Sequence, residues 1–169
     1  AAHFTLLDSR GRSRNDFTMI NVHLVSGQHR VKNHDQAMQR LLEETKRKRW
    51  FKKCIPPGEQ DLMIAGDLNA SRFDHRREKF WSLLELTAWD VLADSRRKYP
   101  PTRLSGVPLR LRRSHLDYII ISKGPRGLAG REIRARTARV HTELLNPSND
   151  TFRRRASDHL PVTVRIRLV

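Results

Sequence analysis

The sequence has little cysteine, no long apolar run and few acidic residues. Cys54 is the single cysteine among 169 residues, which excludes an internal disulfide and a cysteine-rich metal site. No apolar run approaches the roughly 20 residues that a membrane helix needs, and the first residues do not form a charged-then-apolar signal. A lone thiol favours a reducing, intracellular compartment, and nucleus, mitochondrion and bacterial cytoplasm all stay open. Because the sequence begins with Ala1 rather than Met, we expect a processed, trimmed or partial polypeptide.

Acidic residues are scarce relative to basic ones. Asp and Glu number 18 against 34 Lys and Arg, which gives a formal net charge of +16. Such a charge favours polyanionic partners: nucleic acid first, then anionic lipid or a phosphorylated small molecule. The alternative is a basic domain whose charges only solvate its surface. The sequence shows no repeat, low-complexity segment or clean boundary, so we treat residues 1–169 as a single, partial domain.

Hydrophobic periodicity predicts an α/β order of elements. Residues 95–115 should form a long basic loop, and Asn33 should cap the first helix. We expect strands at 3–7, 17–25, 61–66, 116–122, 131–142 and 161–169, and helices at 34–53 and 75–87. This β-β-α-β-α-β-β-β order predicts a mixed sheet with helices on one face.

An acid and an amide follow the apolar strand that stops at Gly66. Asp67 and Asn69 are two residues apart, so on an extended segment both side chains point the same way. The acid can orient a water or accept its proton, and the amide can donate to a phosphate oxygen. The alternative is an Asx-turn, in which both side chains only stabilise the local backbone.

Further polar residues border or interrupt other apolar runs. They are Asn21 and His23 late in one strand, Asp117 in another, and Asp158 and His159 just before the last strand. If these strands lie side by side, three carboxylates, two imidazoles and an amide gather at one place. That set suits metal-assisted phosphoryl chemistry, because hard divalent ions prefer oxygen ligands and polarise phosphate. It does not suit structural zinc, and the sequence has neither a nucleophile elbow nor a P-loop.

Four short motifs, taken in order and at their gaps, carry a resemblance. They are "NVHL" at 21–24, "IAGDLNAS" at 64–71, "SHLDYIIIS" at 114–122 and "SDHLPVTV" at 157–164. Together they resemble the endonuclease/exonuclease/phosphatase superfamily of deoxyribonuclease I-like enzymes. The resemblance implies the C-terminal half of a four-layer α/β sandwich: a mixed sheet with helices on its outer face, the N-terminal half being absent.

The resemblance also implies a role for each catalytic residue. Asp67 would orient or deprotonate the attacking water, and Asn69 would hold a phosphate oxygen. His159 would contact the scissile phosphate, with its tautomer fixed by Asp117. His23 would stabilise the phosphate or assist the leaving group.

Metal and substrate contacts are implied in the same way. Asp158 would help to bind Mg²⁺ or Mn²⁺, directly or through water. The metal-binding Glu that the family carries on an early strand has no counterpart here, so it would be replaced or supplied in trans. Asn21, a candidate substrate-binding residue, would be a structural hydrogen-bonding residue. The charge of the basic loops, rather than the resemblance, adds Arg103, Arg112, Arg113 and Arg154 as substrate-facing residues, for which solvated surface charge is the alternative.

The sequence therefore predicts a Mg²⁺-dependent phosphodiesterase, in first place a nuclease that hydrolyses DNA or RNA. Two alternatives stay open: a nuclease-derived nucleic-acid-binding or scaffold protein in a ribonucleoprotein assembly, and a phosphoinositide phosphatase. The inner face of the sheet should be apolar. We therefore expect a missing N-terminal half or a partner chain to cover it, since soluble proteins avoid large exposed apolar patches.

Overall fold

The computed structural model describes residues 1–25, 31–47, 53–57, 61–71, 74–86, 89–91, 102–105, 112–122, 133–141 and 159–168. Within these ranges the helical elements are α1 (Val31–Arg47), the 3-10 turn η1 (His75–Arg77) and α2 (Glu78–Leu86). The strands are β1 (Ala2–Leu7), β2 (Ser13–His23), β3 (Leu62–Asp67), β4 (Trp89–Val91), β5 (Arg103–Ser105), β6 (Arg112–Ser114), β7 (Asp117–Ser122), β8 (Ile133–Val140) and β9 (Val162–Leu168). No helix among these residues is both long and apolar enough to cross a membrane.

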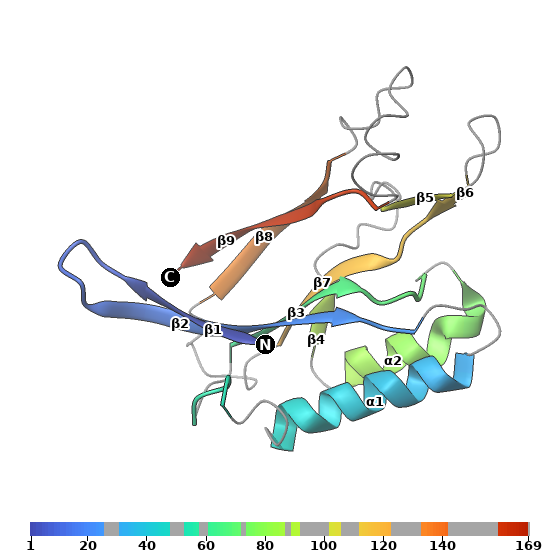
Figure 1. Cartoon of the computed structure of the whole chain (residues 1–169), viewed down its shortest axis with the longest axis horizontal. Helices are drawn as coiled ribbons and strands as arrows, with labels where there is room; N and C mark the ends of the chain where they lie inside the picture. The colour runs from blue at the N-terminus through green and yellow to red at the C-terminus, as the bar shows by residue number, and fades with distance from the viewer. Residues whose placement is uncertain are drawn as a thin grey trace.

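A five-stranded mixed sheet organises the chain, in the order β1-β2-β3-β7-β4. β2 and β3 run parallel, whereas β1 on β2, β3 on β7 and β4 on β7 are antiparallel. Parallel neighbours need a crossover, and α1 lies between β2 and β3 in the sequence to provide it. Both α1 and α2 lie on one side of this sheet, and the β8–β9 hairpin lies on the other (Figure 1). The predicted mixed sheet with helices on one face is confirmed.

The main core lies between the sheet and the two helices. Ile20, Ile64 and Ile120 are buried on neighbouring strands, directly facing the helical layer. The helices contribute Met38, Leu41, Leu42, Phe80, Trp81 and Leu84, which are buried and stand at helical spacing in the sequence. Burying such a side chain contributes about 1.5–3 kcal/mol, so this layer holds the strands that carry the candidate site.

The opposite face of the sheet has its own apolar cluster. Met63, Ile119 and Ile121 are buried there, and Val162 and Val164 of β9 pack against them. Thr163, between these valines, is exposed, as expected for a strand that buries one face. Strand β1 forms one edge of the same sheet.

At that edge, β1 presents aromatic surface. Phe4 stacks on Phe17 with ring centroids 5.1 Å apart, and Phe4 remains 41% exposed. Among the described residues, β9 therefore packs on the apolar face that the sequence predicts, and Phe4 on β1 stays partly exposed.

Three local expectations are wrong. The first helix begins at Val31, so Asn33 lies within the first turn instead of capping it, and Lys53 lies in a turn. Tertiary packing decides this start, because His34 is fully buried one turn into α1. Residues 89–91, for which no strand was expected, form β4, and the expected loop 95–115 contains the paired strands β5 and β6. Three-residue strands are too short to show any periodicity.

Candidate active site

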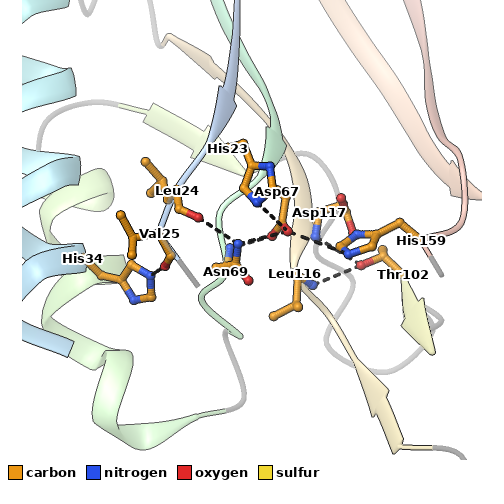
Figure 2. Close-up of polar contacts among 10 residues, drawn as sticks. All are labelled: His23, Leu24, Val25, His34, Asp67, Asn69, Thr102, Leu116, Asp117 and His159. Atoms are coloured by element: carbon orange, nitrogen blue, oxygen red, sulfur yellow. Dashed lines mark hydrogen bonds and ion pairs between the residues drawn. The ribbon is translucent and has the colours of Figure 1, made fainter. Parts of the chain in front are cut away.

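The sheet register places three of the predicted residues side by side. His23 ends β2 and pairs with Asp67 at the end of β3. Asp67 in turn pairs with Asp117, the first residue of antiparallel β7. His159 is the fourth member of the group and lies in the sequence just before β9 (Figure 2). Residues that are far apart in sequence therefore meet at one edge of the sheet.

The four side chains form a chain of polar contacts. His159 donates from Nδ1 to Oδ2 of Asp117 at 2.8 Å, since a carboxylate can only accept. The Nε2 atoms of His159 and of His23 each lie 3.8 Å from the same oxygen, Oδ2 of Asp67. A water or substrate oxygen that bonds this carboxylate oxygen would thus lie beside two imidazoles (Figure 2).

Asp67 is held by an Asx-turn. Its Oδ1 accepts from the backbone N–H of Asn69 at 2.7 Å, and its Oδ2 accepts from Nδ2 of Asn69 at 3.0 Å. Asn69 adopts a φ of 49°, a left-handed conformation that Asn tolerates better than most residues. The Asx-turn interpretation of the Asp-Leu-Asn motif is therefore observed, and the turn places the carboxylate beside the two imidazoles. The catalytic interpretation stays a prediction.

The side-chain amide of Asn69 makes a second hydrogen bond. Its Nδ2 also donates to the carbonyl of Leu24 at 2.8 Å, which ties the residue after β2 to the end of β3. Both N–H groups of the amide are thereby donated, so a phosphate oxygen would have to replace one of these bonds. The expected contact between Asn69 and phosphate stays a prediction.

Burial changes the basicity of Asp67. The pKa of its carboxyl is raised above the ordinary 3.8, mainly by burial and to a smaller extent by the nearby charge of Asp117. The backbone N–H of Asn69 opposes the rise most, followed by His159 and His23. The side chain is 12% exposed. A raised pKa makes a carboxylate a better proton acceptor near neutral pH, as a general base requires.

Gly66 lets β2 and β3 approach each other beside the site. Its φ is 137°, a region that side chains rarely adopt, and a Cβ at this position would lie 2.0 Å from the carbonyl oxygen of Val22. Only glycine fits this contact, which explains why the apolar run of β3 stops directly before Asp67.

Two buried polar residues were missed by sequence reasoning. His34 of α1 is fully buried and its Nε2 bonds the carbonyl of Val25, which follows β2 (Figure 2). Burial is the main cause that lowers the pKa of His34. It shares a helical stripe with Met38 and Leu41, and that spacing could have revealed it. Thr102 is also fully buried and contacts the residues around Asp117, but nothing in its basic, proline-rich surroundings marks it.

Several predicted residues are not brought into this group. Asn21 lies on β2, where it is exposed and pairs with Ala65. The strands β5 and β6 include the positions of Arg103, Arg112 and Arg113, but the side chains of these arginines lie outside the described part of the structure. Asp158 and Arg154 lie outside the described residues altogether.

The expected metal ion is not supported by the described residues alone. Within the ranges that the structure describes, no group of three or more His, Cys, Asp or Glu side chains could hold a metal ion. The carboxylates of Asp67 and Asp117 are engaged by Asn69 and His159. The expected ligand Asp158 lies outside the described residues, so the metal ion stays a prediction.

Comparison with solved structures identifies the fold. D. rerio TDP2 complexed with a single-strand DNA product is similar over 90% of this chain, with a TM-score of 0.62 and 13% sequence identity. A Bacteroides thetaiotaomicron mannosyl-6-phosphatase is similar over 94%, with a TM-score of 0.53 and 16% identity. A Bacteroides vulgatus endonuclease/exonuclease/phosphatase is similar over 99%, with a TM-score of 0.56 and 11% identity. The chain has the endonuclease/exonuclease/phosphatase fold.

The endonuclease/exonuclease/phosphatase fold is present here only in part. The chain spans 56%, 52% and 54% of the lengths of those three structures, which fits the partial domain that the motifs predict. No family model and no curated protein sequence matches the chain. At identities below a fifth the likeness concerns the fold, and the three proteins differ in what their names say they act on.

Proposed function

We propose that this chain carries the catalytic histidine–aspartate half of a phosphodiesterase, and that the enzyme is a nuclease. The observation that supports this most directly is the contact series from Asp117 through His159 to Asp67, with His23 on the far side of the same carboxylate oxygen. A buried carboxylate with a raised pKa between two imidazoles is suited to moving a proton at a phosphate.

The proposed reaction is hydrolysis by direct attack of water. Asp67 takes a proton from the water as the water oxygen forms a bond to phosphorus. The bond between phosphorus and the leaving oxygen breaks, and its electron pair stays on that oxygen, which takes a proton from His23. For this step His159, held through Nδ1 by Asp117, carries a proton on Nε2 as well, so that it donates from Nε2 to a phosphate oxygen and stabilises the charge on that oxygen.

Mg²⁺ or Mn²⁺ remains part of the proposal, with Asp158 as the expected ligand. The ion would polarise the phosphate and stabilise negative charge on it. The arginines at 103, 112, 113 and 154, together with Asn21, are proposed to face the substrate. Substituting these residues tests their role, because none of them is proposed to transfer a proton.

Nucleic acid is the proposed substrate because of charge. The net charge of +16 favours a polyphosphate backbone over a single phosphate monoester. The outer side of the β8–β9 hairpin agrees with this: Arg139 and Thr163 are paired and exposed there, and the register places Arg165 and Arg167 at the alternating positions that follow Thr163. One of the similar structures was solved with a DNA product.

A covering partner is proposed for the open end of the sheet face. Phe4, stacked on Phe17, is 41% exposed on β1, the strand at one edge of the sheet. A missing N-terminal half or a partner chain would bury this aromatic pair, and the partner could also supply the metal-binding Glu that this chain lacks.

The test is a cleavage assay with matched aspartate variants. Plasmid DNA and single-stranded RNA are incubated with the chain, with Asp67→Asn and with Asp16→Asn, each in Mg²⁺ and in EDTA. Asp16 is a surface aspartate of β2 that serves as the control. We expect cleavage that needs Mg²⁺, is lost in Asp67→Asn and is retained in Asp16→Asn.

Other outcomes point to the alternatives. Cleavage that survives Asp67→Asn would refute the assigned site. Salt-sensitive binding that EDTA does not affect, without cleavage, would favour the scaffold alternative. Release of phosphate from phosphoinositides, but not cleavage of nucleic acid, would favour the phosphatase.

A further inference from the structure

Thr102 links the two segments that carry the histidine–aspartate pair. Its hydroxyl oxygen accepts from the backbone N–H of Leu116 at 3.0 Å and from that of Asp117 at 3.1 Å. Its own carbonyl oxygen accepts from the backbone N–H of Leu160, the residue after His159, at 2.6 Å. One fully buried side chain and its carbonyl thus fix the start of β7 and the approach to β9 together (Figure 2).

This link matters because the strands concerned belong to different sheets. β7 pairs with β3 and β4 in the five-stranded sheet, whereas β9 pairs with β8 in a separate hairpin. Strand pairing within the described residues therefore aligns Asp117 with Asp67, but it does not align Asp117 with His159. The bonds of Thr102 provide a backbone connection between the two residues.

The hydroxyl is used as an acceptor, and this use is chemically specific. A threonine hydroxyl has two lone pairs, and here the two backbone N–H groups occupy them. Valine has nearly the same shape but no lone pair, so it would leave two buried N–H groups unsatisfied. Serine would keep both bonds and lose only a methyl group.

We propose that Thr102 is a positioning residue that sets the alignment of the Asp117–His159 pair toward Asp67. It acts through His159 and does not contact the phosphate. The 2.8 Å bond between His159 and Asp117 fixes the tautomer in which Nδ1 carries the proton and Nε2 faces Asp67. This role rests on the proposed phosphodiesterase function, but the alignment itself can be measured without activity.

The sensitivity of the site to alignment gives the expected effect. A displacement of about 1 Å in a reacting group can cost about a hundredfold in rate. We therefore expect Thr102→Val to lower kcat by about tenfold to a hundredfold, with KM changed by less than about threefold, because phosphate contacts elsewhere are kept. Thr102→Ser should recover most of the rate.

The control is another buried threonine. Thr45 on α1 is 4% exposed, and its hydroxyl donates to the carbonyl of Leu42 within the same helix, in the helical layer of the core. Thr45→Val also removes a buried hydroxyl, so it reports any loss of rate that comes from lowered stability alone. Urea unfolding of all three variants shows whether each is folded under assay conditions.

Nitrogen-15 NMR of the histidine rings supplies the readout that needs no catalysis. In the wild-type chain and in Thr102→Ser, the His159 ring should show a protonated, hydrogen-bonded Nδ1. In Thr102→Val this signature should be lost or replaced by a mixture of tautomers, and in Thr45→Val it should persist.

The outcomes separate the two proposals. An unchanged His159 signature in folded Thr102→Val overturns the positioning role, and so does an equal loss of kcat in Thr45→Val. Absence of cleavage by every form, including the wild type, counts against the proposed function. The His159 signature then still decides whether Thr102 aligns the pair.

Discussion

Replacing Gly66 with alanine tests the close approach of β2 and β3 beside the site. The added Cβ would lie 2.0 Å from the carbonyl oxygen of Val22 and 2.9 Å from Oδ1 of Asn21. A carbon atom and a backbone oxygen normally approach to about 3.3–3.6 Å, so the strands would have to separate by about 1.3 Å. Backbone hydrogen bonds between paired strands do not survive such a shift, because their N···O distances span only about 2.7–3.2 Å.

The expected loss of stability follows from two costs. The φ of 137° at Gly66 lies in a region that costs an alanine about 1–3 kcal/mol. Each buried backbone group left without its partner costs about 1–3 kcal/mol more, and the β2–β3 register pairs six residues. We expect Gly66→Ala to lower the free energy of unfolding by more than about 4 kcal/mol, which is exceptional for a single substitution.

Gly11→Ala is the matched control. Gly11 also has a positive φ, 73°, but nothing lies within 4 Å of the position that a Cβ would take. Only the conformational cost of about 1–2 kcal/mol applies there. Urea unfolding followed by tryptophan fluorescence measures both variants. If the two losses agree within about 1 kcal/mol, the strands do not approach as closely as described and the explanation of Gly66 is wrong.

Three further predictions concern titration and packing. The pKa of His34 is lowered below 6.5, so as the pH falls the unfolded chain takes up a proton at this histidine before the folded chain does. The free energy of unfolding should therefore decrease below pH 6.5 by up to about 1.4 kcal/mol per pH unit. Urea titrations of His34→Gln should show a smaller decrease. The rate of cleavage should fall on acidification with a midpoint above 3.8, because Asp67 must be ionised, and Asp117→Asn should move this limb of the pH–rate profile to lower pH. Phe80→Ala should cost about 3–5 kcal/mol in the same urea assay, since the ring is fully buried between helix and sheet.

The long elements of the fold could be predicted from the sequence because their periodicity is strong. The alternation of Val162 and Val164 with exposed Thr163 is visible in β9, and Phe80 and Leu84 stand one helical turn apart in α2. β4, β5 and β6 have three residues each. β4 forms because it pairs with β7, and β5 and β6 form because they pair with each other. Such pairing is decided by tertiary structure, which no local pattern records.

The sequence predicts those residues of the candidate site that lie at strand ends which the sheet brings together. His23, Asp67 and Asp117 stand at the ends or the start of strong strands, and the register brings them together. The double use of the Asn69 amide could not be predicted, because it depends on where the carbonyl of Leu24 lies after folding. The bonds of Thr102 escaped prediction for the same reason, since their partners are backbone N–H groups 14 and 15 residues away.

The residues of the candidate site are far apart in the sequence, and this separation affects when the site forms during folding. Positions 23, 67, 117 and 159 each come from a different segment, and the last of them enters only when β9 docks on Ile119 and its neighbours. Contacts between residues so distant in sequence carry a large loop-closure cost and form late. A partly folded chain that already has its helices and central strands would therefore lack its second imidazole. Recovery of the proposed phosphodiesterase activity after dilution from denaturant should therefore lag behind recovery of the helical signal.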